Sequence, residues 1–251
     1  MDLELKGKNA VITGGSKGIG RSIALHLAEE GANVAICARG EEALKSTEKE
    51  LLEKGVNVIA QICDIGDAEQ LEVFLSNVKD QFKTVDILVN NASALRMGDD
   101  YEDWEASIQV DLMGSVIATQ TVIPWMKESG SGNILFVSSV SGIEAGSPPA
   151  YAAVKAALIS YSKTISEQLA AEHIRVNTIA PGAVEFEGGL WEMIKENNRS
   201  FYNLAVDLNP SGRLGTPDEI AKVATFLVSP AAYWVTGTNL AIDGGAHKSN
   251  H

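Results

Sequence analysis

Short apolar runs alternate along the chain with longer segments in which apolar residues recur with a helical period. The short runs are rich in valine, isoleucine and alanine, and they predict strands at 9–13, 32–37, 57–62, 86–91, 133–138, 175–180 and 239–242. The intervening segments predict amphipathic helices, as with Leu71, Phe74, Leu75, Val78 and Phe82. Strands that are apolar throughout and separated by helices indicate a parallel sheet covered on both faces. We therefore expect an α/β fold, a doubly wound domain with seven parallel strands.

No repeat, low-complexity tract or flexible linker divides the 251 residues, so residues 1–251 are expected to form one domain. No apolar run reaches membrane-spanning length, and the start lacks the basic-then-apolar form of a signal peptide. These features predict a cytoplasmic protein that does not bind membranes. Cys37 and Cys63 each end a predicted buried strand and are expected to be reduced thiols, with no disulfide and no metal site.

The formal net charge of −13 limits the classes of partner. It argues against binding to nucleic acid or to anionic membrane surfaces, and it weakly disfavours a highly acidic protein carrier.

The first predicted strand runs into a glycine-rich turn and then a helix. Glycines permit a tight turn and a close approach of backbone to a pyrophosphate, and the amides at the helix start attract phosphate. The spacing is Gly-x-x-x-Gly-x-Gly, yet the strand–turn–helix context favours dinucleotide binding over a glycine turn without ligand. The expected contacts are Gly14, Ser16, Lys17, Gly18, Ile19 and Gly20.

The second predicted strand is followed by Arg39, where NAD-binding folds usually carry an acid that holds the ribose 2′-hydroxyl. Arg39 and Lys17 predict a site for a 2′-phosphate, and hence NADP(H). NAD(H) remains possible, because both cations could equally be solvated surface charges.

Polar residues also follow the third and fourth predicted strands. Asp64 and Ile65 would lie beside the adenine, although Asp64 could equally cap the next helix, which starts near Asp67. Asn91 and Ala92 come at the same edge of the sheet, where such sheets bind ligands.

Tyr151 and Lys155 lie four residues apart in an alanine-rich helix, so both face the same side. An ammonium fixed beside a phenol favours the phenolate, which suits proton transfer between alcohols and carbonyls. The spacing alone is weak evidence, since it also occurs in ordinary surface pairs. The fifth predicted strand ends in Ser138 and Ser139, and a serine there could donate a hydrogen bond to a substrate carbonyl.

These motifs, in this order, resemble the short-chain dehydrogenase/reductase family over essentially the whole chain. The similarity continues through Arg175-Val176-Asn177, Pro181-Gly182, Gly212-Arg213-x-Gly215, Thr236-Gly237 and Asp243-Gly244-Gly245. The resemblance implies a Rossmann-type fold, an NAD(P)-dependent oxidoreductase with a small-molecule carbonyl or alcohol substrate, and a homotetramer that pairs helices 101–127 and 150–171.

By that resemblance Tyr151 is the general acid/base, Lys155 activates it and bonds the nicotinamide ribose, and a serine polarises the carbonyl. Ser139 precedes Gly142 by three residues, as in the family, whereas Ser138 has the commoner distance of thirteen to Tyr151. A loop absorbs a deletion more easily than a strand end shifts register, so Ser139 is the expected catalytic serine. The remaining expected cofactor contacts are Pro181, Gly182 and Val184.

Three residues depart from the family pattern. Asp111 replaces an asparagine that completes a catalytic tetrad in many relatives, largely through its backbone carbonyl, and Asp111 could keep that catalytic role. Its carboxylate would raise the pKa of Lys155 if it lay close, or it could turn away. Ser93 replaces a glycine. Phe186 replaces a threonine that binds the nicotinamide amide, so the backbone near Val184 would do more of that binding.

Residues 183–212 correspond to the family's variable substrate lid. Their aromatic residues could cover an apolar or cyclic substrate, or could pack onto the sheet. A 3-oxoacyl thioester, a cyclic alcohol, a sugar or a steroid would each suit the scaffold. We therefore expect reversible reduction of a ketone or aldehyde with NADP(H). The alternatives are an NAD-dependent alcohol dehydrogenase and a nucleotide-sensing protein without catalysis.

Overall fold

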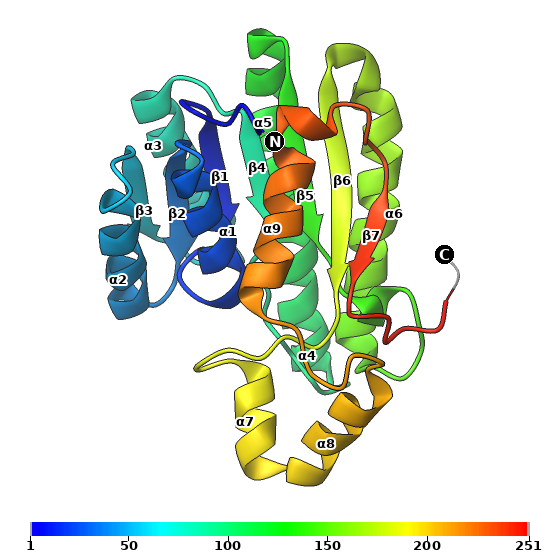
Figure 1. The fold of residues 1–251 in the computed structure, drawn as a ribbon. Coiled ribbons are helices and arrows are strands. Elements are labelled where there is room, and N and C mark those ends of the chain that lie inside the picture. Colours follow the sequence, from blue (N-terminus) through cyan, green and yellow to red (C-terminus); the bar gives the residue numbers. More distant parts are fainter. Residues whose placement is uncertain (1, 250–251) are drawn as a thin grey trace.

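Seven parallel strands form one sheet in the order β3-β2-β1-β4-β5-β6-β7 (Figure 1). The structure, a computed structural model, describes residues 2–249, and Met1, Asn250 and His251 of the expected domain lie outside the described residues. The strands are β1 Asn9–Thr13, β2 Asn33–Ala38, β3 Val58–Ile62, β4 Ile87–Asn90, β5 Gly132–Val137, β6 Ile174–Pro181 and β7 Asn239–Ile242. Every predicted strand is confirmed, with ends that differ by at most one residue.

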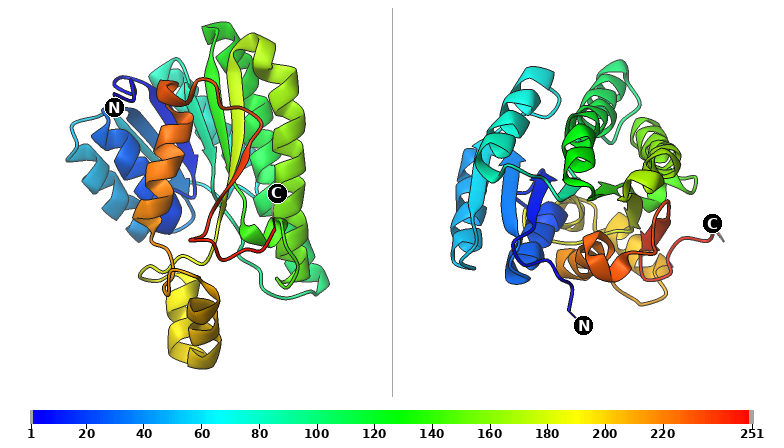
Figure 2. Two further views of the ribbon diagram at one scale, coloured as in Figure 1. Left: turned by 45° about the vertical axis from the view of Figure 1, so that its right-hand side comes forward. Right: turned by 90° about the horizontal axis from the view of Figure 1, so that it is seen from above.

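Helices cover both faces of this sheet, as the continuous apolar strands predict (Figure 2). One face carries α1 Gly18–Glu29, α2 Glu41–Leu52 and α9 Pro217–Val228, and the other carries α3 Ala68–Phe82, α5 Gly114–Ser129 and α6 Pro149–Leu169. Strand β1 shows why the run is apolar throughout. Ala10 and Ile12 join the core under α1 and α9, whereas Val11 between them joins the core under α3 and α5.

The long helix expected over 101–127 is interrupted, which corrects the sequence-based reading. Helix α4 Tyr101–Ala106 passes into a π-helical segment, Ser107–Met113, before α5 begins at Gly114. Gly114 lies so close to Ile65 that a Cβ at Gly114 would be 2.8 Å from the Ile65 carbonyl oxygen. The wider π turn changes the helical phase, and it carries Asp111 with its side chain fully buried.

All seven strands point their carboxyl ends toward the same edge of the sheet, the lower edge in Figure 1. The chain reverses direction across the sheet between β1 and β4, and the crevice at such a switch point is where these folds bind ligands. Below this edge project α7 Leu190–Asn197 and α8 Arg199–Leu208 (Figure 1). Short 3₁₀ turns occupy Val140–Gly142, Ala170–Glu172 and Pro230–Ala232. Within residues 2–249, no helix is long and apolar enough to cross a membrane.

Candidate active site

The glycine-rich turn after β1, residues 13–20, which we call the phosphate loop, is packed so closely that no side chain fits at Gly14 or Gly20. A Cβ on Gly20 would lie 2.4 Å from the Gly14 carbonyl oxygen, and Gly14 itself has a φ of +67°. None of the side chains in residues 2–249 caps the amino end of α1, which starts after Lys17 and has no acid in its first turn. Its first amides are therefore open to a phosphate, and the turn fits a dinucleotide pyrophosphate.

Asn91 braces this turn from the end of β4. Its side-chain amide donates to the carbonyl oxygens of Thr13 at 2.9 Å and Gly14 at 3.1 Å. The Thr13 hydroxyl oxygen accepts from the backbone amides of Asn91 at 3.0 Å and Ala92 at 3.2 Å. The sequence places Asn91 and Ala92 at the cofactor, and the structure shows that the Asn91 amide group is already engaged in holding the phosphate loop.

Arg39 and Asp64 face one another at the expected adenosine end, with 4.0 Å between Arg39 Nη1 and Asp64 Oδ2. Asp64 does not cap the following helix: its Oδ1 accepts from the Gly66 amide at 3.0 Å, and Asp67 is the residue that caps α3. Hydrogen bonds from Gln70 lower the pKa of Asp67, as expected for a carboxylate at a helix start.

The remaining expected cofactor residues border the same edge of the sheet. The Ser16 carbonyl accepts from the Thr47 hydroxyl at 3.0 Å, which fixes the turn against α2. The Gly182 amide donates to the Ile242 carbonyl at 3.0 Å, directly after Pro181 ends β6. Buried Val184 pairs with Gly215 in an isolated parallel bridge. The structure thus places these segments at the end of the sheet where the phosphate loop lies.

The two serines after β5 have different hydrogen bonds. Ser138 is buried, and its hydroxyl donates to the Lys155 carbonyl oxygen at 2.8 Å. The Ser139 oxygen accepts from the Ser141 amide at 3.1 Å, and among the described residues no acceptor takes its hydroxyl proton. Gly142 lets this turn approach α6, since a Cβ there would lie 2.8 Å from the Ala156 nitrogen.

Tyr151 and Lys155 share one face of α6, with Lys155 Nζ 5.5 Å from the centroid of the Tyr151 ring. The Lys155 side chain is 2% exposed, and its ammonium donates to the Val137 carbonyl at 3.1 Å. Asp111 Oδ1 lies 3.1 Å from Lys155 Nζ, so Asp111 faces the lysine and does not turn away. Burial lowers the pKa of Lys155, but the attraction of Asp111 and Tyr151 outweighs it, and the net pKa is raised.

Ser93 is a contributor to this cluster that the sequence did not reveal. Its hydroxyl donates to Asp111 Oδ1 at 2.5 Å, and the Ala94 amide donates to Oδ2 at 2.8 Å. The sequence marked Ser93 only as a lost glycine, because no local pattern shows that it meets a residue eighteen positions away.

The lid segment begins over the phosphate loop. A Cβ on Gly18 would lie 2.5 Å from Phe186 Cζ, so the Phe186 ring rests directly on that glycine. The same ring packs against Gly189. Phe186 is partly buried against the core, as the packing alternative predicts for the lid aromatics.

Helices α7 and α8 pack on each other and not on the sheet, which corrects that alternative for their aromatic residues. The Trp191 and Phe201 rings stack with centroids 5.9 Å apart. Glu185 lies between β6 and α7 and links both helices to this segment. Its carboxylate accepts from Lys195 Nζ of α7 and from the Tyr202 hydroxyl of α8, each at 2.5 Å. The hydrogen bonds from Lys195 and Tyr202 lower the pKa of Glu185.

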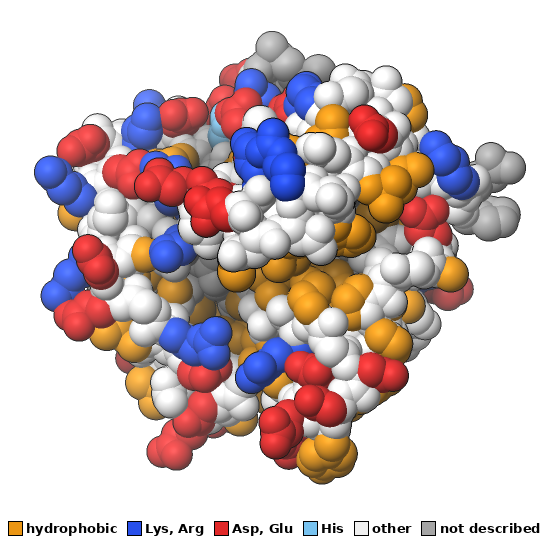
Figure 3. Space-filling view, turned by 90° about the horizontal axis from the view of Figure 1, so that it is seen from below, with side chains coloured by type: hydrophobic (Ala, Val, Ile, Leu, Met, Phe, Trp, Pro, Cys, Tyr) orange, Lys and Arg blue, Asp and Glu red, His pale blue; other side chains and the backbone are white. Residues whose placement is uncertain are grey.

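The face below the sheet is apolar at its centre. Seen from below, hydrophobic side chains gather there with Lys and Arg side chains beside them (Figure 3). Met193, Phe201, Leu204 and Leu208 of α7 and α8 are all exposed. In residues 2–249 there is no group of three or more His, Cys, Asp and Glu side chains that could hold a metal ion.

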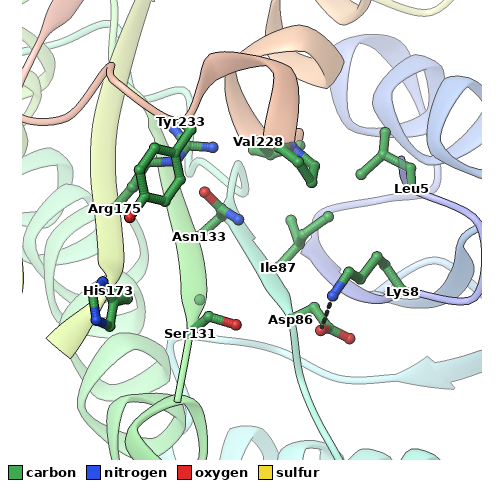
Figure 4. A pocket seen from close by; sticks show the side chains of 12 residues that line it. Leu5, Lys8, Asp86, Ile87, Ser131, Asn133, His173, Arg175, Val228 and Tyr233 are labelled. Atoms are coloured by element: carbon green, nitrogen blue, oxygen red, sulfur yellow. Dashed lines mark hydrogen bonds and ion pairs between the residues drawn. The ribbon is translucent and has the colours of Figure 1, made fainter. Parts of the chain in front are cut away.

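A separate hollow opens at the amino end of the sheet (Figure 4). Its charged groups have partners: Lys8 Nζ lies 3.1 Å from Asp86, and Arg175 donates to the carbonyls of Ser229 and Val235 at 2.9 Å. Burial lowers the pKa of Arg175 to about 10. None of the expected site residues lines this hollow. Arg175 there holds the segment after α9 against the start of β6, and the candidate site lies at the other edge of the sheet.

Known proteins are similar to this chain in sequence and in fold. A family described as enoyl-(acyl carrier protein) reductase matches residues 14–247. The 3-oxoacyl-[acyl-carrier-protein] reductase FabG of Thermotoga maritima is 38% identical over 249 residues, covering 97% of this chain and 99% of that protein. The chain belongs to the short-chain dehydrogenase/reductase family. This confirms the resemblance found in the sequence.

Solved structures of this oxidoreductase family agree in fold. L-Sorbose reductase from Gluconobacter frateurii, in complex with NADPH and L-sorbose, is 32% identical with a TM-score of 0.89, covering 99% of this chain and 100% of that one. NAD⁺-bound xylitol dehydrogenase is 27% identical with a TM-score of 0.91, covering 96% and 100%. Short-chain dehydrogenases/reductases act on small molecules with NAD or NADP, and the doubly wound Rossmann-type fold is confirmed.

Proposed function

We propose that this protein reversibly reduces a ketone or aldehyde to an alcohol with NADP(H), using Tyr151 as the general acid/base. The observation that carries the proposal is the Lys155 ammonium, buried and charge-paired, 5.5 Å from the Tyr151 ring. A buried cation beside a phenol has a chemical use in proton transfer that a surface pair lacks.

The nicotinamide, when bound, supplies hydride to the carbonyl carbon or accepts it from the alcohol carbon. In reduction the Tyr151 hydroxyl gives its proton to the carbonyl oxygen, and in oxidation the phenolate takes it back. The Ser139 hydroxyl donates a hydrogen bond to the same oxygen, which stabilises its developing negative charge. Ser139 is favoured over Ser138 because the Ser138 proton already bonds the Lys155 carbonyl.

The residues around the phosphate loop would hold the cofactor. The open amides at the start of α1 would bind the pyrophosphate, and Asp64 and Ile65 would border the adenine. Lys17 and Arg39 would pair with a ribose 2′-phosphate. One observation favours NAD(H) as the second candidate: Asp64 lies 4.0 Å from Arg39 and partly neutralises it.

The substrate we propose is uncharged and apolar or cyclic. Exposed apolar side chains on α7 and α8 would cover such a molecule if the lid closes toward the sheet. Glu187 on the lid and Glu144 in the loop before α6 are both exposed acids that would repel an anion. The net charge of −13 likewise disfavours an acidic carrier protein.

A homotetramer remains part of the proposal. Ile108 and Met113 are 38% and 39% exposed on the helical segment expected to pair between subunits. Covering such side chains would favour association. Light scattering of the purified protein would give the mass directly, and a monomer at micromolar concentration would contradict this part.

The deciding experiment follows NADPH and NADH oxidation with a panel of a 3-oxoacyl thioester, a cyclic ketone, a ketose and an oxosteroid. We expect turnover with NADPH on at least one uncharged carbonyl. Tyr151→Phe should abolish turnover and leave NADPH binding largely intact. Tyr161→Phe is the matched control, because Tyr161 lies farther along α6 and packs edge-on against Phe136.

Full activity in Tyr151→Phe would refute the mechanism. NADPH binding without turnover across the whole panel would favour the nucleotide-sensing alternative.

A further inference from the structure

Two of the residues that depart from the family pattern, Ser93 and Asp111, are in direct contact. The Ser93 hydroxyl donates to Asp111 Oδ1 at 2.5 Å. Its oxygen accepts from the Leu95 amide at 3.1 Å, so the hydroxyl proton points toward the carboxylate. Glycine at position 93, the residue common in the family, could make neither bond. The hydrogen bond between Ser93 and Asp111 therefore requires both departures from the family pattern.

The carboxylate is held from both sides. The Ala94 amide donates a hydrogen bond to Oδ2 at 2.8 Å, and Oδ1 is shared between the Ser93 hydroxyl and Lys155 Nζ. The Asp111 side chain is fully buried and the Lys155 side chain is 2% exposed, so the ion pair between them is shielded from water. Short charge-assisted hydrogen bonds in a buried site fix geometry more firmly than bonds between neutral groups.

We infer that Ser93 is a positioning residue for the reaction, acting through Asp111 to hold Lys155 in place beside Tyr151. The inference rests on the proposed function and assigns a residue to it. Because Asn91 and Ala92 brace the phosphate loop, the same short segment contacts both the expected dinucleotide site and the carboxylate that pairs with Lys155.

The groups that face Lys155 come from three elements. Asp111 approaches from the π-helical segment, Tyr151 from α6 itself, and the Val137 carbonyl from β5. Of these groups, Asp111 carries the negative charge, and replacing it with asparagine removes that charge while keeping the shape of the side chain. In Asp111→Asn the burial of Lys155 is no longer offset by that carboxylate, and the lysine loses its proton at lower pH.

The test is a double-mutant cycle of wild type, Ser93→Ala, Asp111→Asn and the double variant. Carbonyl reduction is measured from pH 6 to 10 with the substrate found by the panel, together with the dissociation constant of NADPH. We expect Ser93→Ala to lower kcat about tenfold in the wild-type background and less than about twofold in Asp111→Asn. Asp111→Asn should shift the pH profile of kcat by about one unit or more, because the charge beside Tyr151 changes.

A purely structural role for Ser93 would give the same fold loss of kcat in both backgrounds, and that result overturns the inference. Ser93→Ala with wild-type kcat would overturn it as well, even if Asp111→Asn did not fold.

An inactive wild type would instead refute the proposed function, and thermal unfolding then tests the contact between Asp111 and Lys155 without catalysis. A raised pKa in the folded state adds stability below the unfolded value, whereas a lowered pKa removes it. The stability difference between wild type and Asp111→Asn should therefore narrow as pH rises from 7 to 10. A constant difference contradicts the inference.

Discussion

Replacing Lys155 with methionine should destabilise the protein strongly, because it removes the counter-charge of a buried carboxylate. Asp111 has no exposed side-chain surface, and Lys155 Nζ is the cation that contacts it, at 3.1 Å. Methionine preserves most of the lysine's apolar volume, so packing along α6 changes little. The loss is therefore mainly electrostatic.

The magnitude follows from what remains around Asp111. Removing one partner of a buried ion pair typically costs about 3–5 kcal/mol. Here the Ser93 hydroxyl and the Ala94 amide still donate to the carboxylate at 2.5 and 2.8 Å, which places the expected loss near the lower limit. We expect about 3 kcal/mol, or a fall in Tm of about 6–12 °C for a chain of this size.

Urea unfolding followed by circular dichroism at pH 7 measures this loss. The matched control is Lys163→Met, since Lys163 lies two turns farther along α6 and is exposed. It should change stability by less than about 0.5 kcal/mol. The double variant Lys155→Met with Asp111→Asn should recover most of the loss, because no unpaired charge remains. A loss in Lys155→Met equal to that of the control would refute the electrostatic argument.

Three further outcomes test the cofactor site and the lid. Arg39→Asp should shift the ratio of kcat/KM from NADPH toward NADH by at least about tenfold, and an unchanged ratio would count against a 2′-phosphate site. Phe186→Ala should speed NADPH association about threefold or more in stopped-flow measurements, because the ring now covers the phosphate loop; slower association would show that the ring helps binding. The pKa of Glu185 is lowered, so its stabilisation of the lid is present above the ordinary glutamate pKa and is lost as pH falls below about 4. Trp191 fluorescence should report that acid transition, and Glu185→Gln should lack it; the same transition in both proteins would contradict the assignment.

The order of elements and the phosphate loop were readable from the chain because both depend on local spacing. Strands buried on both faces must be apolar at every position, and helices that cover them must repeat their apolar residues with a helical period. Tyr151 and Lys155 were placed on one face by the same period. The structure confirms every predicted strand to within one residue at each end.

The orientation of Asp111 was not readable, because it depends on a change of helical phase. The period over 101–127 predicts one continuous helix, whereas the π-helical segment Ser107–Met113 turns Asp111 inward. Spacing to Gly142 favours Ser139 over Ser138, but the engagement of the Ser138 hydroxyl by the Lys155 carbonyl on α6 was likewise not readable. Contacts across such distances have no signature in local spacing.

The sequence by itself thus determined the fold and the motifs of the phosphate loop and of α6, since hydrophobic periodicity and motif spacing are local properties of the chain. Only the tertiary structure decided the surroundings of Lys155. Ser93 and Asp111 come from different segments, and they meet because β4 ends beside the π-helical turn on the same edge of the sheet. Burial also strengthens the ion pair between Asp111 and Lys155, because a carboxylate and an ammonium removed from water interact far more strongly than the same pair on the surface.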